Sequence, residues 1–235
     1  MCAILVGPRA WPGAPMPGMH LTSEEAVEVE RRVAALEART GIQVVAAVVA
    51  KADHYPEIPW TAFALGASLG ALATALADLL RQPWAASGAA LPNGVATLAA
   101  GATCALAAVL APGFARLFLR ASRADGEVLQ HAEGMFLERE VFRTPSRTGL
   151  LLLASLFERR VVVVPDVGFR GRVGPEEWRP VVERMTPALA AGRTAAAFGD
   201  GLAALEELLV NKGFSAVGAP QAPALPDQPV EERGA

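Results

Sequence analysis

Two long apolar blocks constrain the fold of this chain more than any other feature of its sequence. The first spans 60–80 and the second 95–119, and each carries one charged residue near its end, Asp78 and Arg116 respectively. A helix needs roughly 20 apolar residues to cross about 30 Å of hydrocarbon. Both blocks are long enough, so the sequence predicts a transmembrane helical hairpin over 59–119.

The composition and the flanking residues favour a membrane location for this hairpin. Hydrophobic residues make up 52% of the chain and charged residues 19%, and the mean hydropathy is +0.32. Trp60 and Trp84 bracket the first block, as interfacial anchors do. Gly66 and Gly70 form a G-x-x-x-G pattern, which lets two helices approach closely in lipid. The alternative is a pair of Ala-rich helices buried in a protein core.

Basic residues predict the orientation of the hairpin, because Lys and Arg near the span ends stay on the cytoplasmic side. The connecting loop, 81–94, carries only Arg81. The outer flanks carry four basic residues: Lys51, Arg116, Arg120 and Arg123. The first 20 residues hold too short an apolar run for a secretory signal and have no basic region before it. We therefore expect two passes, with both termini and the globular part in the cytoplasm.

The sequence around the hairpin alternates between helix and strand patterns. Thr22 and Glu25 form a capping box that begins a helix, and Gly41 ends it. Three segments are apolar on both faces, as strands covered on both sides are: 42–50, 149–156 and 160–164. Further helices are expected at 125–141, from Pro175 to a break near Thr186 that Pro187 imposes, and at 194–211.

This order predicts an α/β fold, specifically a three-layer α/β/α sandwich interrupted by the two-helix transmembrane hairpin. The globular domain is divided into a first part over 21–55 and a second part over 123–214. A Pro/Gly-rich flexible arm is expected over 1–20. A disordered tail, rich in Pro and Ala, is expected over 215–235.

Charge and cysteine content exclude some classes of protein. The chain has 21 basic and 24 acidic residues, for a net charge of -3. A nucleic-acid partner would require a basic patch or stripe, so we expect none. The two cysteines, Cys2 and Cys104, do not make a disulfide framework, and Cys104 lies inside the second apolar block, where a thiol behaves as a small apolar group.

Several long segments together resemble one known family. The segment LTSEEAVEVERRVAALEARTGIQVVAAVVAKADHY, followed by a membrane hairpin, resembles the opening of the bacterial membrane-bound branch of the TPM-domain family. RTGLLLLASLFERRVVVVPDVGF, then VGPEEWRPVVERM and FGDGLAALEELLVNKGF, is similar to the second half of that domain. The resemblance covers about 21–214. It implies an α/β/α sandwich in the bacterial inner (plasma) membrane.

The resemblance also implies a range of activities. Some TPM domains are associated with acid phosphatase activity, some bind calcium through acidic loops, and others are accessory proteins of membrane complexes. This sequence departs from the phosphatase-like pattern at Arg147-Thr148-Gly149, where an Asn or Asp often precedes the glycine. An acidic group is therefore missing, which weakens any transfer of metal binding or phosphatase chemistry.

One loop offers candidate chemistry. Asp166 follows a strand end, where α/β sheets bind ligands, and Arg170 and Arg172 lie in the same loop. A carboxylate for a divalent cation and two cations for a phosphate would suit phosphoryl chemistry, and Asp166 is the leading candidate metal ligand. The alternative is an ordinary turn, because Pro-Asp-x-Gly is common turn chemistry. Glu127 and His131, four residues apart, are a weaker metal pair.

Two functions remain from the sequence. The first is a noncatalytic interaction or accessory module of a membrane complex, held by the lipid bilayer and docking a protein partner. It needs no cofactor, and the catalytic residues are unknown because the sequence contains no nucleophile motif. The second is a phosphatase-like hydrolase that depends on a divalent metal, with Ca²⁺ as the candidate ion at Asp166.

Overall fold

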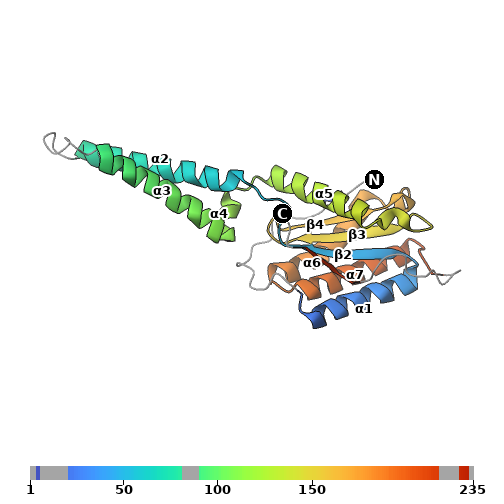
Figure 1. The fold of residues 1–235 in the computed structure, drawn as a ribbon. Helices are drawn as coiled ribbons and strands as arrows, with labels where there is room; N and C mark the ends of the chain where they lie inside the picture. The colour runs from blue at the N-terminus through green and yellow to red at the C-terminus, as the bar shows by residue number, and fades with distance from the viewer. Residues whose placement is uncertain (1–3, 6–20, 81–89, 217–227, 233–235) are drawn as a thin grey trace. The chain divides into compact units, whose positions relative to one another are not determined.

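The computed structural model describes residues 4–5, 21–80, 90–216 and 228–232 and divides into two compact units. Unit 1 combines Met1–Asp53 with Ala121–Ala235, and unit 2 is His54–Arg120. Unit 1 is a mixed α/β structure and unit 2 is helical (Figure 1). Most of the expected arm, 1–20, and of the expected tail, 215–235, lies outside the described residues.

A mixed sheet lies at the centre of unit 1, with the strand order β1-β4-β3-β2-β5. Strand β2 runs parallel to β3, and β3 runs antiparallel to β4. The strands are β1 (Ile4–Leu5), β2 (Gln43–Val49), β3 (Gly149–Ser155), β4 (Arg160–Pro165) and β5 (Val230–Glu232). Every residue of β2, β3 and β4 is buried.

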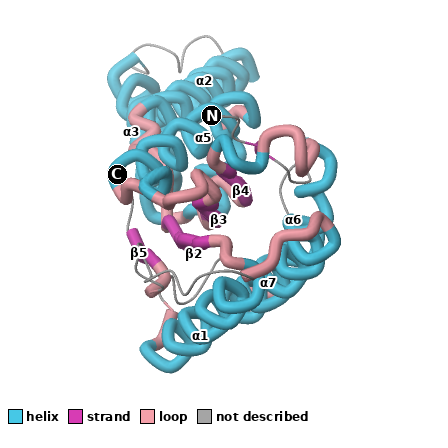
Figure 2. Tube along the Cα trace, turned by 90° about the vertical axis from the view of Figure 1, so that its right-hand side faces the viewer, coloured by secondary structure: helices cyan, strands magenta, loops and turns pink. Residues whose placement is uncertain are grey.

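The alternation of side chains along the strands explains this complete burial. Side chains such as Val44 and Leu152 join one apolar cluster with helices α1, α6 and α7. The intervening side chains, such as Val45 and Leu151, join a second cluster with α5. Figures 1 and 2 show α1, α6 and α7 along one face of the sheet and α5 along the other. These helices are α1 (Ser23–Thr40), α5 (Ala121–Glu138), α6 (Arg179–Ala190) and α7 (Thr194–Asn211).

The ends of α1 form as the sequence predicts. The Thr22 side chain accepts a bond from the Glu25 N–H, and the Glu25 carboxylate accepts the Thr22 N–H at 2.8 Å. Gly41 closes the helix with φ of 70°, a left-handed conformation that glycine adopts without strain. The expected helix over 194–211 is also confirmed as α7.

Two helix predictions around prolines are wrong in part. α6 continues through Pro187 to Ala190 because the burial of Ala188 and Leu189 in the first cluster favours helix beyond the proline. The second apolar block is helical over α3 (Ala90–Leu110) rather than 95–119. Pro112 starts a separate short helix, α4 (Pro112–Ala115), and the extended backbone at Ala111 separates the two, as a residue before proline prefers.

Three short 3-10 turns connect elements in the described part of unit 1. They are η3 (Val141–Arg143), η4 (Val167–Phe169) and η5 (Pro175–Trp178). The helix expected from Pro175 therefore begins as η5 and continues as α6. The edge strand β5, inside the segment expected to be a disordered tail, pairs in parallel with β2 through Ala47 and Val230. Val230 of β5 is buried in the second apolar cluster, which stabilises the strand. The composition of the tail did not indicate this burial, so the prediction of disorder is wrong for β5.

Unit 2 is an antiparallel pair of long helices, α2 (Glu57–Leu80) and α3, followed by α4 and the turn η2 (Arg116–Phe118). Glycines make the close contact between α2 and α3. A methyl group on Gly66 would lie 2.6 Å from the Ala100 carbonyl oxygen, and one on Gly101 would lie 2.8 Å from the Phe63 ring. The G-x-x-x-G pattern therefore brings the two helices of one chain together.

A polar pair joins the two helices at the loop end of the hairpin. Asn93 in the first turn of α3 donates to the Asp78 carboxylate at 2.5 Å. This contact satisfies the one acidic residue of the first apolar block. The residues Ala90–Gly94, expected to be part of the connecting loop, are helical.

Gly149, at the start of β3, provides a test of the packing that fixes this sheet. A Cβ atom at Gly149 would lie 1.9 Å from the Val141 carbonyl oxygen, which is backbone and cannot rotate away. We expect Gly149→Ala to lower the free energy of unfolding by about 3 kcal/mol, as overpacking does. Gly134→Ala, in the open interior of α5, is the matched control. It should change the stability by no more than about 1 kcal/mol in the stabilising direction, and chemical unfolding followed by circular dichroism measures both. Equal effects of the two substitutions would contradict this packing.

Candidate functional site

Asp166 lies directly after β4, at the edge of the sheet where β3 begins. Its N–H donates to the Gly149 carbonyl at 2.9 Å, which continues the β3–β4 ladder by one step. Its side chain accepts the Val167 N–H at 2.7 Å and so caps the turn η4. The Asp166 carboxylate is therefore fixed by the backbone on both sides of it.

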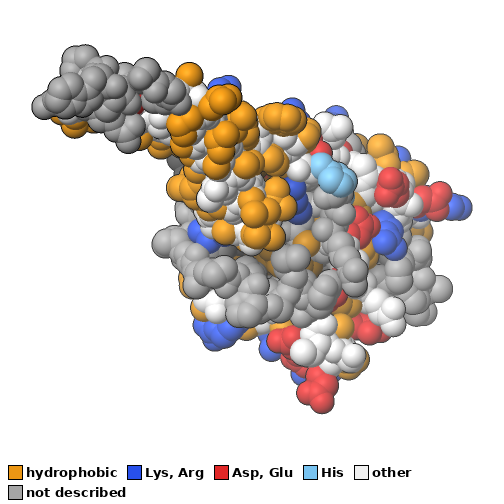
Figure 3. All heavy atoms as spheres, turned by 60° about the vertical axis from the view of Figure 1, so that its left-hand side comes forward, with side chains coloured by type: hydrophobic (Ala, Val, Ile, Leu, Met, Phe, Trp, Pro, Cys, Tyr) orange, Lys and Arg blue, Asp and Glu red, His pale blue; other side chains and the backbone are white. Residues whose placement is uncertain are grey.

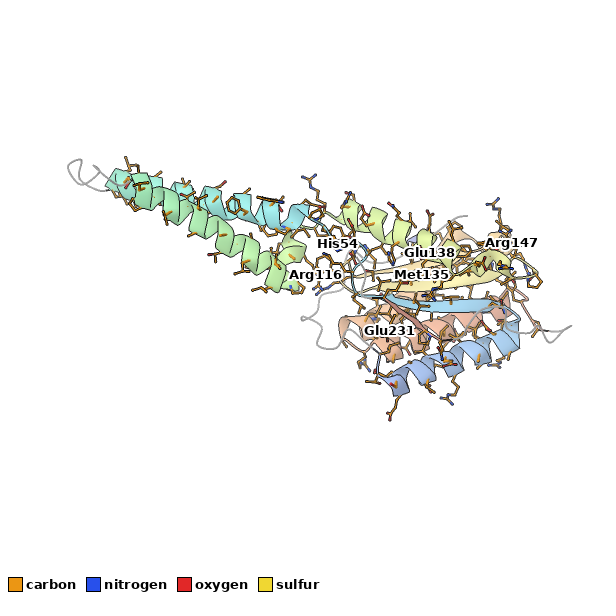
Figure 4. The ribbon with its side chains drawn as sticks, in the orientation of Figure 1. His54, Arg116, Met135, Glu138, Arg147 and Glu231 are labelled. Carbon is orange, nitrogen blue, oxygen red and sulfur yellow. The ribbon has the colours of Figure 1, made fainter. Side chains whose placement is uncertain are left out.

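Arg147 is the cationic partner of Asp166. Its Nε donates to Asp166 Oδ2 at 2.7 Å and its Nη2 donates to Oδ1 at 3.0 Å, a two-bond fork. The Asp166 side chain is 3% exposed and that of Arg147 is 51% exposed. The hydrogen bond to Asp166 raises the pKa of the Arg147 guanidinium above its usual value, so it remains charged at physiological pH. Figure 4 shows Arg147 at this end of the sheet.

The backbones around these two residues are also joined. The Gly168 N–H donates to the Arg147 carbonyl at 2.8 Å, and a Cβ on Gly168 would lie 2.5 Å from that oxygen. Arg147 itself has φ of 53°, an uncommon value for a residue other than glycine. The loop before β3 and the loop after β4 thus form one rigid corner, with the ion pair at its centre.

This arrangement changes what Asp166 can do chemically. Both of its oxygens accept hydrogen bonds from protein donors, and the fork of Arg147 supplies the positive charge that a cation would supply. Within the described residues, no three His, Cys, Asp or Glu side chains are grouped so that they could hold a metal. Asp166 therefore connects two loops through hydrogen bonds to both of its carboxylate oxygens.

Sheet topology places Asp166 differently from the sequence argument. Ligands favour the carboxyl ends of strands, and Asp166 does follow the carboxyl end of β4. However, β3 is antiparallel to β4 and parallel to β2. The carboxyl ends of β2 and β3 therefore lie at the opposite end of the strands. Of these three strands, only β4 has its carboxyl end beside Asp166.

A cleft of about 660 Å³ opens next to this corner. The back of the cleft is aromatic and buried, with Phe169 and Trp178 packed edge to face at 5.5 Å between ring centres. Phe214 packs on the other side of Phe169 at 5.3 Å. The cleft is lined by residues 165–167, 169–175, Glu177 and Trp178, and by Lys212 at the end of α7.

Glu177 and Lys212 form an ion pair at the cleft. The second Glu177 oxygen accepts the Gly174 N–H at 2.7 Å. The Lys212 ammonium, and then the Gly174 N–H, lower the pKa of the Glu177 carboxyl below its usual value. The charge of Lys212 is therefore balanced within the chain.

Arg172 and Arg170 supply the other positive charges of the cleft. The Arg172 guanidinium lies 3.6 Å from the centre of the Phe214 ring and donates to the Lys212 carbonyl at 3.3 Å. Across the described part of the chain, no acidic side chain forms an ion pair with Arg170 or Arg172. Both side chains are exposed. The two arginines of the predicted loop thus line the cleft, while Asp166 is occupied by Arg147.

The weaker pair from the sequence, Glu127 and His131, does not converge. Glu127 pairs with Arg123 at 3.1 Å, and His131 Nε2 lies 3.4 Å from the Glu232 carboxylate on β5. Sequence reasoning missed Arg147 as a site residue. The signal for it was the departure at Arg147-Thr148-Gly149, where a cation replaces the expected acidic or amide side chain.

Comparison with known proteins identifies a similar fold and no family. No family model matches the sequence, and no curated protein matches it. An NMR structure of the BA42 protein from the psychrophilic bacterium Bizionia argentinensis is similar, with a TM-score of 0.53 and 11% sequence identity. The match covers 90% of this chain and 94% of that one. At this identity the likeness concerns the fold alone.

The engagement of Asp166 by Arg147 leads to a prediction about metals. Calcium, magnesium or manganese at millimolar concentration should leave the thermal unfolding midpoint unchanged, because a ligand that binds only the folded state would raise it. The measurement is a thermal shift titration of the full chain. A rise in the midpoint that Asp166→Ala abolishes would contradict this reading and favour the metal-dependent phosphatase.

The lowered pKa of Glu177 leads to a second prediction, about pH. A carboxyl whose folded pKa is depressed stabilises the fold above its unfolded pKa, near 4.5, and loses that contribution as the pH falls through the folded value. We expect Glu177→Gln to unfold at a lower temperature than the wild type at pH 7. The gap should narrow as the pH falls below about 4.5. Glu183→Gln, at an exposed position of α6 outside the cleft lining, is the control. A gap between wild type and Glu177→Gln that does not depend on pH would refute the assignment.

Proposed function

We propose that this chain is a noncatalytic docking module held in a membrane by its helical hairpin. The observation that carries the proposal is the apolar outer surface of α2 and α3. Only 6% and 11% of their most apolar 18-residue windows are buried. Large side chains such as Leu69, Leu72 and Leu98 are more than half exposed. Figure 3 shows the apolar side chains spread over this hairpin.

The alternative from the sequence, a pair of buried core helices, conflicts with this exposure. An uncovered apolar surface of this size is costly in water, and a lipid bilayer covers it without further protein. The polar pair of Asp78 and Asn93 lies at one end of the hairpin, where headgroups and water are accessible. We infer two passes with unit 1 in the cytoplasm from the basic residues that flank the spans. The inner membrane of a bacterium is inferred from the resemblance in sequence.

The docking role rests on the side chains of unit 1. The Asp166 carboxylate is paired with Arg147 and accepts hydrogen bonds from the chain at both oxygens. What unit 1 offers is a cleft with an apolar back and two exposed arginines. The TPM-like, three-layer form of unit 1 is part of this proposal; its support is the packing of helices against both faces of the sheet and the resemblance in sequence.

The membrane proposal is tested by alkaline extraction of isolated membranes. The wild-type chain should stay in the membrane pellet. Leu69→Arg together with Leu98→Arg places one charge near the centre of each span, at a cost of about 2.5–3.5 kcal/mol per charge. This double variant should be lost from the pellet, whereas Val27→Arg, a similarly exposed apolar residue of α1, should not.

Release of the wild-type chain by alkali would contradict the membrane proposal. The orientation has its own readout in the same cells. A reporter that is active only outside the cytoplasm, fused after Ala235, should be silent. Activity of that fusion would contradict the inferred orientation, but it would not contradict the membrane anchor.

A further inference from the structure

The charges around the cleft do not balance. Four of its neighbouring ionic side chains form two pairs, Asp166 with Arg147 and Glu177 with Lys212. The remaining two, Arg170 and Arg172, have no acidic partner among the residues that the structure describes. The cleft therefore presents an excess positive charge to the solvent, and an anionic ligand would complement it.

Contacts with the protein are described for the Arg172 side chain and not for that of Arg170. Arg172 is fixed by the Phe214 ring and by the carbonyls of Lys212 and Gly213. Gly171 between them has φ of 79° and open space around its Cα. A side chain or a backbone segment of a ligand can therefore approach the loop closely between the two cations.

An apolar surface adjoins these cations. The Val167 side chain lines the cleft and is 40% exposed. Pro175 is exposed on the other side, and Phe169 and Trp178 form the back. A ligand that fits this surface carries apolar groups next to its negative charges.

The polar groups of the cleft favour a peptide over a small molecule. Small-molecule sites fix their ligands with a few convergent polar groups. Here the carboxylates of Asp166 and Glu177 already accept hydrogen bonds from donors of the protein itself. Arg170 and Arg172 are exposed and do not converge on one point. They therefore complement the charge of an extended segment that contacts the cleft at several points.

We propose that the cleft between η4, η5 and Lys212 binds an acidic peptide segment of a partner protein, with Arg170 and Arg172 pairing with its carboxylates and its apolar side chains packing on Val167 and Pro175. This assignment rests on the proposed docking function and specifies the chemistry of the partner. Because the pairs are exposed, binding weakens as the ionic strength rises.

The test uses the full chain in nanodiscs of neutral phosphatidylcholine. The labelled protein is applied to arrays of immobilised dodecapeptides that carry two Glu, two Gln or two Lys residues around varied apolar positions. Retention is expected on the Glu peptides, at least about tenfold stronger than on their Gln counterparts. Arg170→Glu with Arg172→Glu should abolish this retention.

Two variants keep the test specific. Arg179→Glu with Arg193→Glu makes the same change in net charge outside the cleft. This double variant should still be retained on the Glu peptides. Arg170→Glu alone should also weaken retention on the Glu peptides. Because no contact of the Arg170 side chain with the fold is described, this weakening would not reflect unfolding.

Four results would overturn the proposal: no retention of Glu peptides, equal retention of Gln or Lys peptides, full retention by the Arg170 and Arg172 variants, or displacement of the peptides by citrate at matched ionic strength. The last result would assign the cleft to small anions. Alkaline extraction of the same variants separates this proposal from the membrane anchor, because the cleft substitutions should leave the chain in the pellet.

Discussion

Burial of both faces of the strands β2, β3 and β4 is the constraint on which the rest of unit 1 depends. Each strand is apolar on both sides, so helices must cover both faces. The first face is covered by α1, α6 and α7, and the second by α5, which follows the hairpin in sequence. The chain must therefore return to the sheet after the insertion. An ion pair of Asp53 with Arg123, at 3.2 Å, joins the two points where unit 1 is interrupted.

The same sheet determines the chemistry at its other edge. Antiparallel pairing of β3 with β4 brings the residues before β3 next to those after β4. A carboxylate buried at such a corner needs a charged or hydrogen-bonding partner, and Arg147 provides it from the neighbouring loop. The partner stabilises the corner and donates to both carboxylate oxygens of Asp166. The carboxylates of Asp166 and Glu177 are thus paired within the chain, while Arg170 and Arg172 have no acidic partner among the described residues.

Much of unit 1 could be predicted from local patterns. The capping box at Thr22, the glycine stop at Gly41 and the uninterrupted apolar strands each depend on neighbouring residues, and they form as expected. The predictions that failed depended on distant contacts. Pro187 stays within α6 because buried neighbours hold it, and β5 forms because the β2 edge accepts it. The role of Arg147 required knowledge of which loops meet. The sequence identified Arg170 and Arg172 in the loop after β4, but it did not indicate that Asp166 pairs with Arg147.

Site-specific photo-crosslinking in living cells tests the docking role most directly. A photoreactive amino acid is placed at Val167, at the cleft, or at Val27, an exposed residue of α1. A docking module predicts one protein partner crosslinked from Val167 in a fixed ratio, absent from Val27, and lost when Arg170 and Arg172 are replaced. Equal crosslinking from both positions, or a chain without a partner at Val167, would contradict the account.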